Sequence, residues 1–463
     1  MSESMLNEKE VLLQDEVIEE TSTEASTQQS DVLLKVENLC QFFKLGHHTL
    51  KAVNNVNFEI KRGEVFGLVG ESGCGKTTTG RSIIKLYDCT SGNVYFEGRR
   101  ICAGLQSYKD TKKEAKKALV EALKANRVAL KEKCVDIKAQ SLSEADEKTA
   151  IATAKKESSD AKKAELAKYL AIAKEENAKI KSAKHDHKKC DKDYAKEHVE
   201  AVKAKYCAQL QELDKNSQEY KEINAQYKKE LHVARRERIV TKIQMIFQDP
   251  IASLDPRMTV REIISEGLII KGVRDRKVIE EKVYEVLEKV GLVREHANRY
   301  PHEFSGGQRQ RIGVARSIIM QPELIIADEP VSALDVSIQA QVINLLNELR
   351  HELGITILFV AHDLSVVKYF SDRIAVMYFG NMVELASSEE LFKNPLHPYT
   401  RSLLSAIPLP DPVYEKTRTR IVYNPLADHD YREQGPSFRE VAPGHFVSCN
   451  DEEMKKYQEI LNK

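Results

Sequence analysis

The chain has 463 residues, of which 71 are basic and 71 acidic, so its formal net charge at pH 7 is zero. That length can hold two or three domains, and the charge balance excludes a whole-molecule preference for nucleic acid or anionic membranes. We find no signal peptide, no apolar run of about eighteen residues that could cross a bilayer, and no C-x-x-C pair among the eight cysteines, a pattern typical of a reduced, cytosolic protein.

The N-terminal residues 1–32 have the composition of a disordered acidic tail. Residues 1–31 contain nine acidic residues and one lysine, with Ser, Thr and Gln between them. Two strand-type runs rich in Val and Phe follow, Leu33–Phe43 and Val53–Ile60. They open the first part of a folded domain, which we place at residues 33–104.

A buried strand then runs directly into a glycine-rich turn. The stretch EVFGLVG leads into GESGCGKTT, which fits G-x-x-x-x-G-K-[ST] and is followed by a helical pattern. Such a P-loop wraps backbone N–H groups around phosphate oxygens, and the helix N-terminus adds its positive end. Lys76 is expected to reach the β- and γ-phosphates, and Thr77 to offer its hydroxyl to magnesium. The predicted ATP-binding residues of this loop are Gly70, Glu71, Ser72, Gly73, Cys74, Gly75, Lys76, Thr77 and Thr78.

Residues 105–238 predict a helical insertion, because no Gly or Pro occurs between Leu105 and Asp249. Apolar and aromatic residues recur every seven positions from Val199 to Ala234, as in a seam for a partner helix. Ser141–Glu147 can cap a helix, and the polar stretch around His185 can break one. We expect an antiparallel hairpin or a three-helix coiled-coil arm, in which a helix of about 45 residues would be roughly 70 Å long. The alternative is a charged, solvated tract with little fixed structure.

Residues 239–385 contain the second part of the interrupted domain. Strands LIIAD (324–328) and TILFVAH (356–362) flank the helical pattern VSIQAQVINLLNELRHEL. Strand–helix–strand repeats of this kind predict an α/β fold with a parallel sheet covered by helices on both faces. Asp328, at the end of its strand, would face the metal, and Glu329 could orient and deprotonate an attacking water.

The stretch FSGGQRQR (304–311) resembles the signature motif of ATP-binding cassette (ABC) ATPases. Its residues Ser305, Gly306, Gly307 and Gln308 would open a helix whose N-terminal amides can face a γ-phosphate. In that family the phosphate belongs to ATP held by the opposite subunit. The resemblance therefore implies an ABC-type P-loop ATPase, with a RecA-like core, a β subdomain and a helical subdomain, that works as a dimer.

Other positions match the family's pattern one by one. Gln248 in IFQDP resembles the glutamine that contacts magnesium and the attacking water, and His362 in VAHDLS resembles the histidine that holds the γ-phosphate. The loop SALD resembles the loop that crosses the dimer interface, through Ser332 and Asp335. Phe43 is the aromatic residue expected to stack on adenine, with Phe42 the next candidate. The resemblance thus gives Glu329, His362 and Gln248 catalytic roles, and assigns magnesium to Thr77, Gln248 and Asp328.

Further stretches resemble the ATPase subunits of oligopeptide and dipeptide importers. They are residues 50–83, QMIFQDPIASLDPRMTV (244–260) and ELFKNPLHPYTRSLLSAIPLPDP (390–412), and FREVAPGHFV (438–447) is similar to the F-type subunit. Residues 386–463 are accordingly expected to be a C-terminal oligopeptide-transporter extension. Since Cys449 is the single cysteine of this region, we expect no iron–sulfur cluster.

The resemblance implies an ATP-hydrolysing subunit that uses ATP and Mg²⁺ to power oligopeptide import. Its expected partners are a D-type ATPase subunit in a heterodimer, two transmembrane permease subunits and, indirectly, an extracellular peptide-binding protein. Its expected location is peripheral, on the cytoplasmic side of the cell membrane.

The alternative function is that of a soluble coiled-coil-bearing ABC ATPase acting mechanically on nucleic acid. In such proteins the coil is far longer and follows the Gln248-type residue, whereas here it precedes that residue. They also lack the NPLHPYTRSLLSAIP ending. We therefore expect no nucleic-acid partner.

Overall fold

The structure, a computed structural model, describes residues 31–139, 144–213, 215, 217–407 and 420–461. The acidic tail to residue 30, the first residues of the predicted cap at Ser141–Glu147, and residues 408–412 of the importer-like ending lie outside the described residues.

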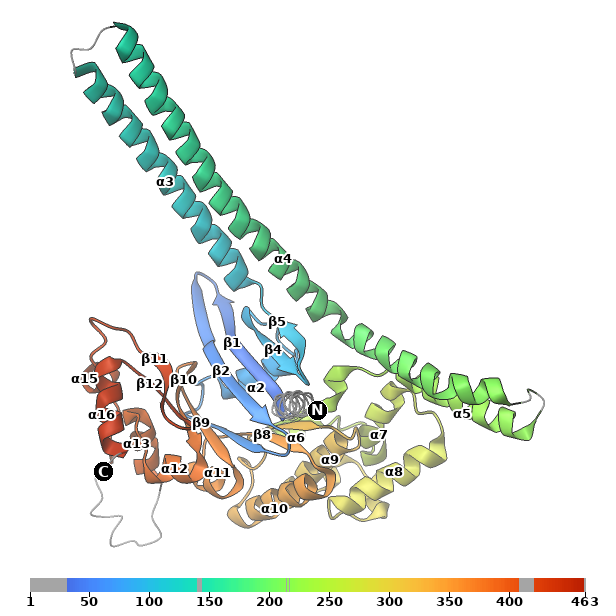
Figure 1. Ribbon diagram of the computed structural model, residues 1–463. Helices are drawn as coiled ribbons and strands as arrows, with labels where there is room; N and C mark the ends of the chain where they lie inside the picture. The colour runs from blue at the N-terminus through green and yellow to red at the C-terminus, as the bar shows by residue number, and fades with distance from the viewer. Residues whose placement is uncertain (1–30, 140–143, 214, 216, 408–419, 462–463) are drawn as a thin grey trace, which may run out of the picture.

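Two sheets form the body of the protein (Figure 1). The first is antiparallel, with strand order β2-β1-β4-β5, and consists of β1 Val32–Leu45, β2 His48–Lys61, β4 Ser91–Phe96 and β5 Arg99–Ala103. The second has the order β11-β12-β10-β9-β3-β8-β7-β6 and is parallel from β9 to β6. Its strands are β3 Val65–Val69, β6 Ile243–Ile246, β7 Leu324–Asp328, β8 Thr356–Ala361, β9 Arg373–Tyr378, β10 Asn381–Ser387, β11 Ser437–Ala442 and β12 His445–Cys449. The predicted α/β fold is confirmed.

The parallel strands are apolar on both faces because a separate core covers each face. In β3, Val65 and Val69 belong to the core shared with the helices, whereas Phe66 and Leu68 belong to the core shared with the antiparallel sheet.

The helices of the body are α2 Lys76–Ile83, α6 Pro250–Ser253, α7 Val260–Lys271, α8 Arg276–Lys289, α9 Gly306–Ile318, α10 Val336–Leu353 and α11 Leu364–Phe370, with 3₁₀ turns η1 Ile239–Lys242, η2 Arg294–Asn298 and η3 Pro301–Glu303.

The C-terminal extension is built onto the edge of the second sheet. It contains α12 Ser388–Lys393, α13 Pro398–Ser405, α15 Pro425–Asp428 and α16 Asp451–Leu461, besides β11 and β12. The fully buried carboxylate of Glu384 on β10 accepts hydrogen bonds from the backbone N–H groups of Leu396 (2.8 Å) and His397 (3.1 Å). Nε2 of His445 on β12 lies 2.8 Å from the same carboxylate. One buried acid thus fixes two parts of the extension.

The insertion consists of three helices, α3 Gln106–Ala139, α4 Glu144–Glu212 and α5 Gln218–Ala234. The first part of α4 pairs with α3 to form a long arm, and its last part pairs with α5 in a second hairpin that extends in a different direction (Figure 1). Of the two predicted forms, an antiparallel hairpin and a three-helix arm, the structure has the three-helix form. At 69 residues, α4 is longer than expected, roughly 100 Å.

Two details predicted for the insertion are wrong. The polar stretch around His185 does not break a helix, because α4 continues through it and docks there on the antiparallel sheet. The seven-residue repeat from Val199 to Ala234 is not one continuous seam, since the chain reverses after α4 and Ser217 caps α5. Tyr206 and Tyr227 instead face each other across this hairpin, with ring centroids 5.6 Å apart.

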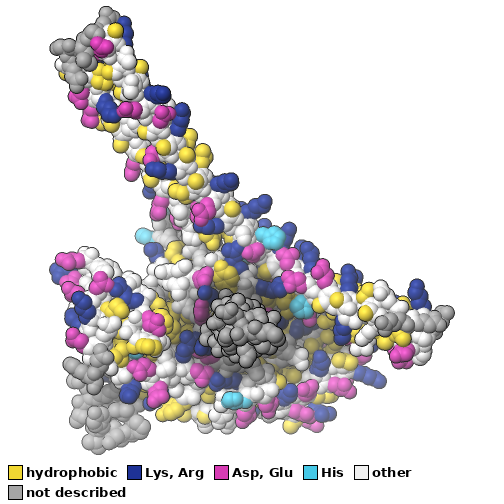
Figure 2. All heavy atoms as spheres, in the orientation of Figure 1, with side chains coloured by type: hydrophobic (Ala, Val, Ile, Leu, Met, Phe, Trp, Pro, Cys, Tyr) yellow, Lys and Arg dark blue, Asp and Glu magenta, His cyan; other side chains and the backbone are white. Residues whose placement is uncertain are grey.

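The arm is held by small and polar residues as well as apolar ones. Ala154, Ala173 and Ala183 of α4 are buried, and small side chains of this kind let helices approach closely. Asn126 Nδ2 donates to the carbonyl of Ser158 (2.9 Å), whose hydroxyl donates back to Asn126 Oδ1 (3.0 Å). Figure 2 shows basic and acidic side chains interspersed along the visible face of the arm.

The root of the arm, by which we mean α4 residues 182–198, is fastened to β5. The Arg100 guanidinium bonds to Asp186 (2.5 Å) and to the hydroxyl of Ser182 (2.7 Å). Arg99 pairs with Glu197, and the ring of Tyr194, 5 % exposed, lies under the Arg99 guanidinium. These contacts make the middle of α4 part of the ATPase body.

Candidate nucleotide-binding site

The P-loop between β3 and α2 depends on glycine conformations that other residues rarely adopt. Gly70, Gly73 and Gly75 have φ angles of 148°, 82° and 107°. A Cβ at Gly70 would collide with the carbonyl oxygen of Met377, and one at Gly75 with that of Ala52. The loop is therefore shaped by the sheet on one side and by β2 on the other.

Lys76 begins α2 and turns its side chain back into this loop. Its ammonium group donates to the carbonyl oxygens of Gly70 (2.7 Å) and Glu71 (3.0 Å), and its side chain is 3 % exposed. The Glu329 carboxylate is 4.0 Å away. A buried cation held by neutral carbonyls and one acid is available to an incoming polyphosphate.

The residues predicted to hold magnesium at the start of α2 and the end of β7 are in contact. The hydroxyl of Thr77 donates to Asp328 Oδ1 at 2.7 Å. The other oxygen of Asp328 is buried and has no hydrogen-bond partner among the described residues, and burial raises the pKa of this carboxyl. A cation would satisfy that oxygen, and hydroxyl and carboxylate oxygens are ligands that Mg²⁺ prefers. The residues present therefore fit the metal.

Glu329 lies at the centre of the predicted catalytic group. Its Oε2 accepts from Gln248 Nε2 (3.0 Å) and lies 3.1 Å from Nδ1 of His362. Its backbone has φ 45°, an uncommon value for a non-glycine residue, and its N–H donates to Val360 of the next strand. The structure thus brings together three side chains that follow three different strands, β6, β7 and β8.

A cavity of about 670 Å³ opens above these side chains. It is lined by Ser72, Gln248, Asp249, Glu329, Ser332, Ala333 and His362. The imidazole of His362 is half exposed there, at 51 % of its side-chain surface. The cavity therefore joins the P-loop to Gln248, Glu329 and His362, with Ser332 at its border.

The signature residues are not among those that line this cavity. Ser305 caps α9, where its hydroxyl accepts from the N–H of Gln308 and its own N–H donates to the Gln308 side chain. Ser305 and Gly306 are exposed, and a Cβ at Gly307 would collide with Ile338 of α10. Asp335 caps α10, and the N–H of Ile338 lowers the pKa of its carboxyl. Within one chain, the P-loop and the signature are separate surfaces.

Phe43 lies near the end of β1, half-buried, with its ring against Tyr87 at a centroid distance of 5.4 Å. Phe42, also half-buried, pairs with Lys51 of β2. The next residue, Ala52, carries the carbonyl oxygen with which a Cβ at Gly75 would collide. Both aromatic residues are therefore on the β1–β2 hairpin beside the P-loop.

Tyr399 is a site contact that the sequence reasoning missed. It lies on α13 of the C-terminal extension, and its hydroxyl accepts from the backbone N–H of Glu71 at 3.1 Å. The ring is packed between Tyr378 and Tyr423 and is almost fully buried. Tyr399 belongs to the stretch HPYTRS, whose only signal in the sequence is its resemblance to peptide importers. Because this stretch is far from the P-loop in sequence, no spacing could have placed Tyr399 against Glu71.

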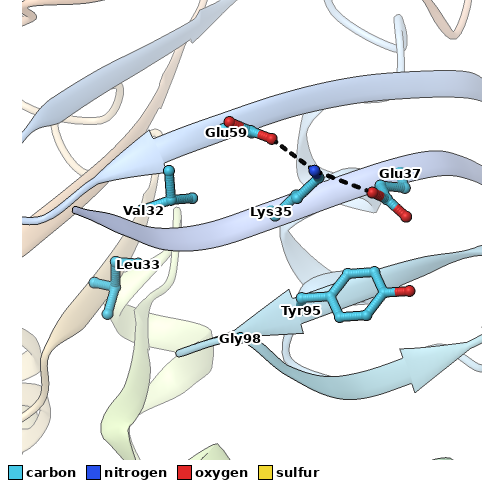
Figure 3. Close-up of a pocket in the computed structure, with 7 residues that line it drawn as sticks. All are labelled: Val32, Leu33, Lys35, Glu37, Glu59, Tyr95 and Gly98. Carbon is cyan, nitrogen blue, oxygen red and sulfur yellow. Dashed lines mark ion pairs between the residues drawn. The ribbon is translucent and has the colours of Figure 1, made fainter. Parts of the chain in front are cut away.

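A second concavity, of about 440 Å³, lies on the antiparallel sheet (Figure 3). The Lys35 ammonium at its centre is 3.0 Å from Glu59 and 3.2 Å from Glu37, and Tyr95 lies beside them. Its lining includes none of the predicted site residues. The lysine charge is already balanced by two carboxylates, so we do not assign nucleotide to this surface.

Comparison with known proteins gives two family matches. Residues 53–184 and 209–332 match the family described as ABC transporter, and residues 383–440 match the oligopeptide/dipeptide transporter C-terminal region. Among the described residues, no helix combines the length and apolarity needed to span a bilayer.

Three curated relatives align over nearly the whole chain. The oligopeptide transport ATP-binding protein OppF of Bacillus subtilis is 42 % identical over 429 residues, covering 92 % of this chain and 99 % of the relative. AmiF, the oligopeptide transport ATP-binding protein of Streptococcus pneumoniae, is 39 % identical, covering 94 % and 100 %. The dipeptide transport ATP-binding protein DppF of Lactococcus lactis is 36 % identical, covering 92 % and 96 %. The chain is thus similar to these proteins in both its ATPase part and its C-terminal extension.

Proposed function

Because this chain belongs to the ABC transporter family, we propose that it is the ATP-hydrolysing subunit that powers import of oligopeptides across a membrane. The observation that carries the proposal is the Glu329 carboxylate, which meets Gln248 and His362 at a cavity bordered by the P-loop. The C-terminal match and the names of the relatives support peptides as the cargo. They give no support to the alternative of a mechanical ATPase on nucleic acid.

In this mechanism the P-loop amides and Lys76 bind the β- and γ-phosphates. Binding draws the Lys76 ammonium away from the carbonyls of Gly70 and Glu71. Thr77, Asp328 and Gln248 would hold Mg²⁺, which, when bound, neutralises charge on the phosphate oxygens.

Glu329 then accepts a proton from the attacking water, while His362 turns its half-exposed ring to the γ-phosphate. In the structure, His362 Nδ1 lies 3.1 Å from Glu329 Oε2. During hydrolysis this contact is replaced by a contact of His362 with the nucleotide and a contact of Glu329 with the water.

Two chains are needed for a complete site in this proposal. Ser305 and Gly306 are exposed and lie apart from the chain's own cavity, which suits contact with nucleotide on another subunit. We assign that role to a D-type ATPase partner, with Ser332 and Asp335 at the interface. Two membrane permease subunits would convert closure into alternating access, and an extracellular binding protein would deliver the peptide. The chain would work peripherally, on the cytoplasmic side of the membrane.

We also propose that the protein has no iron–sulfur centre and no nucleic-acid partner. Cys449, the cysteine of the C-terminal region, is fully buried in β12, where burial raises the pKa of its thiol to about 11. A protonated thiol in an apolar setting is a poor metal ligand. The mixed charges on the arm give no continuous basic surface on the face seen in Figure 2.

The test is Glu329→Gln in the purified transporter complex. The amide keeps the size of the side chain but accepts no proton, so ATP binding should persist while hydrolysis falls by about two orders of magnitude or more. Glu352→Gln, on the exposed end of α10, is the matched control and should hydrolyse ATP normally. Uptake of a labelled oligopeptide by cells that make each variant as the sole copy is the second readout. Normal uptake with Glu329→Gln would refute the importer assignment.

A further inference from the structure

Two buried thiols meet beneath the root of the arm, outside the nucleotide site. Cys89 lies in the turn between α2 and β4, and Cys102 lies on β5. Their Sγ atoms are 2.8 Å apart, about 0.8 Å more than in a disulfide. Cys89 is 8 % exposed and Cys102 is fully buried. The two sulfurs therefore need only a small shift to bond.

The insertion supplies a histidine to this pair. His187 of α4 lies with Nε2 3.2 Å from the carboxylate of Asp88, while its Nδ1 is buried and makes no hydrogen bond among the described residues. Cys102 is the main group that raises the pKa of His187. The imidazole thus lies near an exposed carboxylate and a buried thiol, and the thiol is the larger cause of its raised pKa.

The same contacts separate the acidities of the two thiols. Hydrogen bonding from Cys89, and then the interaction with His187, lower the pKa of Cys102 to about 5 against the effect of burial. Hydrogen bonding to Cys102 and burial raise the pKa of Cys89. These contacts therefore favour the thiolate, the form that reacts with electrophiles, on Cys102, with Cys89 as the hydrogen-bond donor to it.

We propose that Cys89 and Cys102 are a peroxide-reactive thiol pair that closes to an intramolecular disulfide beneath the root of the arm. The oxidant is a hydroperoxide of the size of hydrogen peroxide, because Cys102 is fully buried and Cys89 is only 8 % exposed.

The reaction balances in two steps. The Cys102 thiolate attacks one peroxide oxygen and the O–O bond breaks, which leaves a sulfenic acid on Cys102 and, with one proton, releases water. Cys89 then attacks the sulfenic sulfur and loses its proton, and the departing hydroxyl leaves as a second water. Overall, two thiols and one peroxide give one disulfide and two waters. His187 acts as a positioning residue that stabilises the thiolate.

Other cysteines of the chain serve as internal controls. Cys40 is buried but its sulfur contacts backbone groups, and Cys190 accepts a hydrogen bond from Lys85 at 3.0 Å. Cys207 is exposed on α4, where Gln211 Nε2 donates to its sulfur at 3.6 Å. A reagent that merely attacks accessible sulfur would modify Cys207 first.

The primary test needs no variant. The full chain is exposed to limiting hydrogen peroxide, quenched, alkylated under denaturing conditions and mapped by mass spectrometry. The expected product is the cross-linked peptide pair containing Cys89 and Cys102, formed several-fold faster than any oxidation of Cys207. Oxidation of Cys207 while Cys89 and Cys102 both remain alkylatable would refute the proposal.

Two variants test the individual roles. In Cys89→Ser, peroxide should leave a Cys102 sulfenic acid that is trapped by dimedone, and absence of that adduct would contradict Cys102 as the attacking thiol. In His187→Gln, the rate should fall several-fold at pH 7 and should rise between pH 6 and 8, whereas the wild-type rate should be nearly flat there. Lys188→Gln, at an exposed neighbouring position, is the matched control. An unchanged rate and pH profile in His187→Gln would refute the role of the histidine.

Discussion

Acidification should loosen the C-terminal extension through a single buried histidine. His397 is 2 % exposed, and its Nδ1 accepts from the N–H of Tyr399, so it caps α13 in the neutral form. Burial, followed by the nearby His429 and Arg401, lowers the pKa of His397 from 6.5 to about 3. The unfolded segment therefore binds a proton below pH 6.5 that the folded segment does not bind until about pH 3. The contribution of His397 to the stability of the extension is therefore present above pH 6.5 and is lost progressively as the pH falls from 6.5 toward 3.

The magnitude follows from the shift. Between pH 7 and pH 5 this one group should favour the open extension by about 25-fold, or ~2 kcal/mol. Cys449 reports the opening, because it is fully buried in β12 of the same extension. Its rate of reaction with a pyridyl disulfide, corrected by the rate of a model peptide at each pH, gives the opening equilibrium.

The matched variant is His397→Asn, which keeps an N-cap acceptor for α13 and removes the titrating ring. Between pH 7 and pH 5 the opening equilibrium of the wild type should rise by a factor about 25 times larger than that of the variant, because the variant lacks the contribution of His397. Equal pH dependence in the two proteins would refute the reasoning, because every other titrating group of the extension is common to both.

Three further outcomes are expected. Tyr399→Phe removes the acceptor of the Glu71 N–H and should raise the KM for ATP about five-fold in steady-state hydrolysis, with the thermal midpoint nearly unchanged. Glu384→Gln should cost about 2–3 kcal/mol of stability in thermal unfolding, because a buried carboxylate loses its charge-assisted bonds, whereas Glu390→Gln, which is partly exposed, should cost little. Replacing residues 119–170 by a short turn should shorten the arm but leave ATP hydrolysis and folding intact. Replacing residues 105–238 should lower the thermal midpoint, since only this larger deletion removes the root of the arm.

Most residues predicted for the nucleotide site belong to local patterns, which is why the sequence alone could point to them. The P-loop, the Asp328–Glu329 pair and the signature are each contiguous, and each adopts the strand–turn–helix setting that its residues require. Gln248 and His362 were identified by resemblance rather than by spacing. Their meeting at Glu329 follows from neighbouring parallel strands, β6, β7 and β8, whose ends share one edge of the sheet.

Tertiary contacts account for what the sequence did not predict. The heptad pattern runs on from α4, which ends at Glu212, into α5, which Ser217 caps, because antiparallel partner helices share the same periodicity. Tyr399 contacts Glu71 from an extension that Glu384 fastens to the sheet. The contact between Tyr399 and Glu71 has no local signature, since it joins residues far apart in the chain.

The root of the arm shows why the insertion is more than an attachment to a complete ATPase. Polar residues around His185 favoured a break because they resemble a solvated loop. Instead Asp186 and Ser182 bind Arg100, and Tyr194 packs in the same buried cluster as Ile101 and Cys102 of the antiparallel sheet. A helix that supplies side chains to that core cannot move without disturbing β5. The root of the arm is therefore a structural part of the ATPase body rather than an attachment to it.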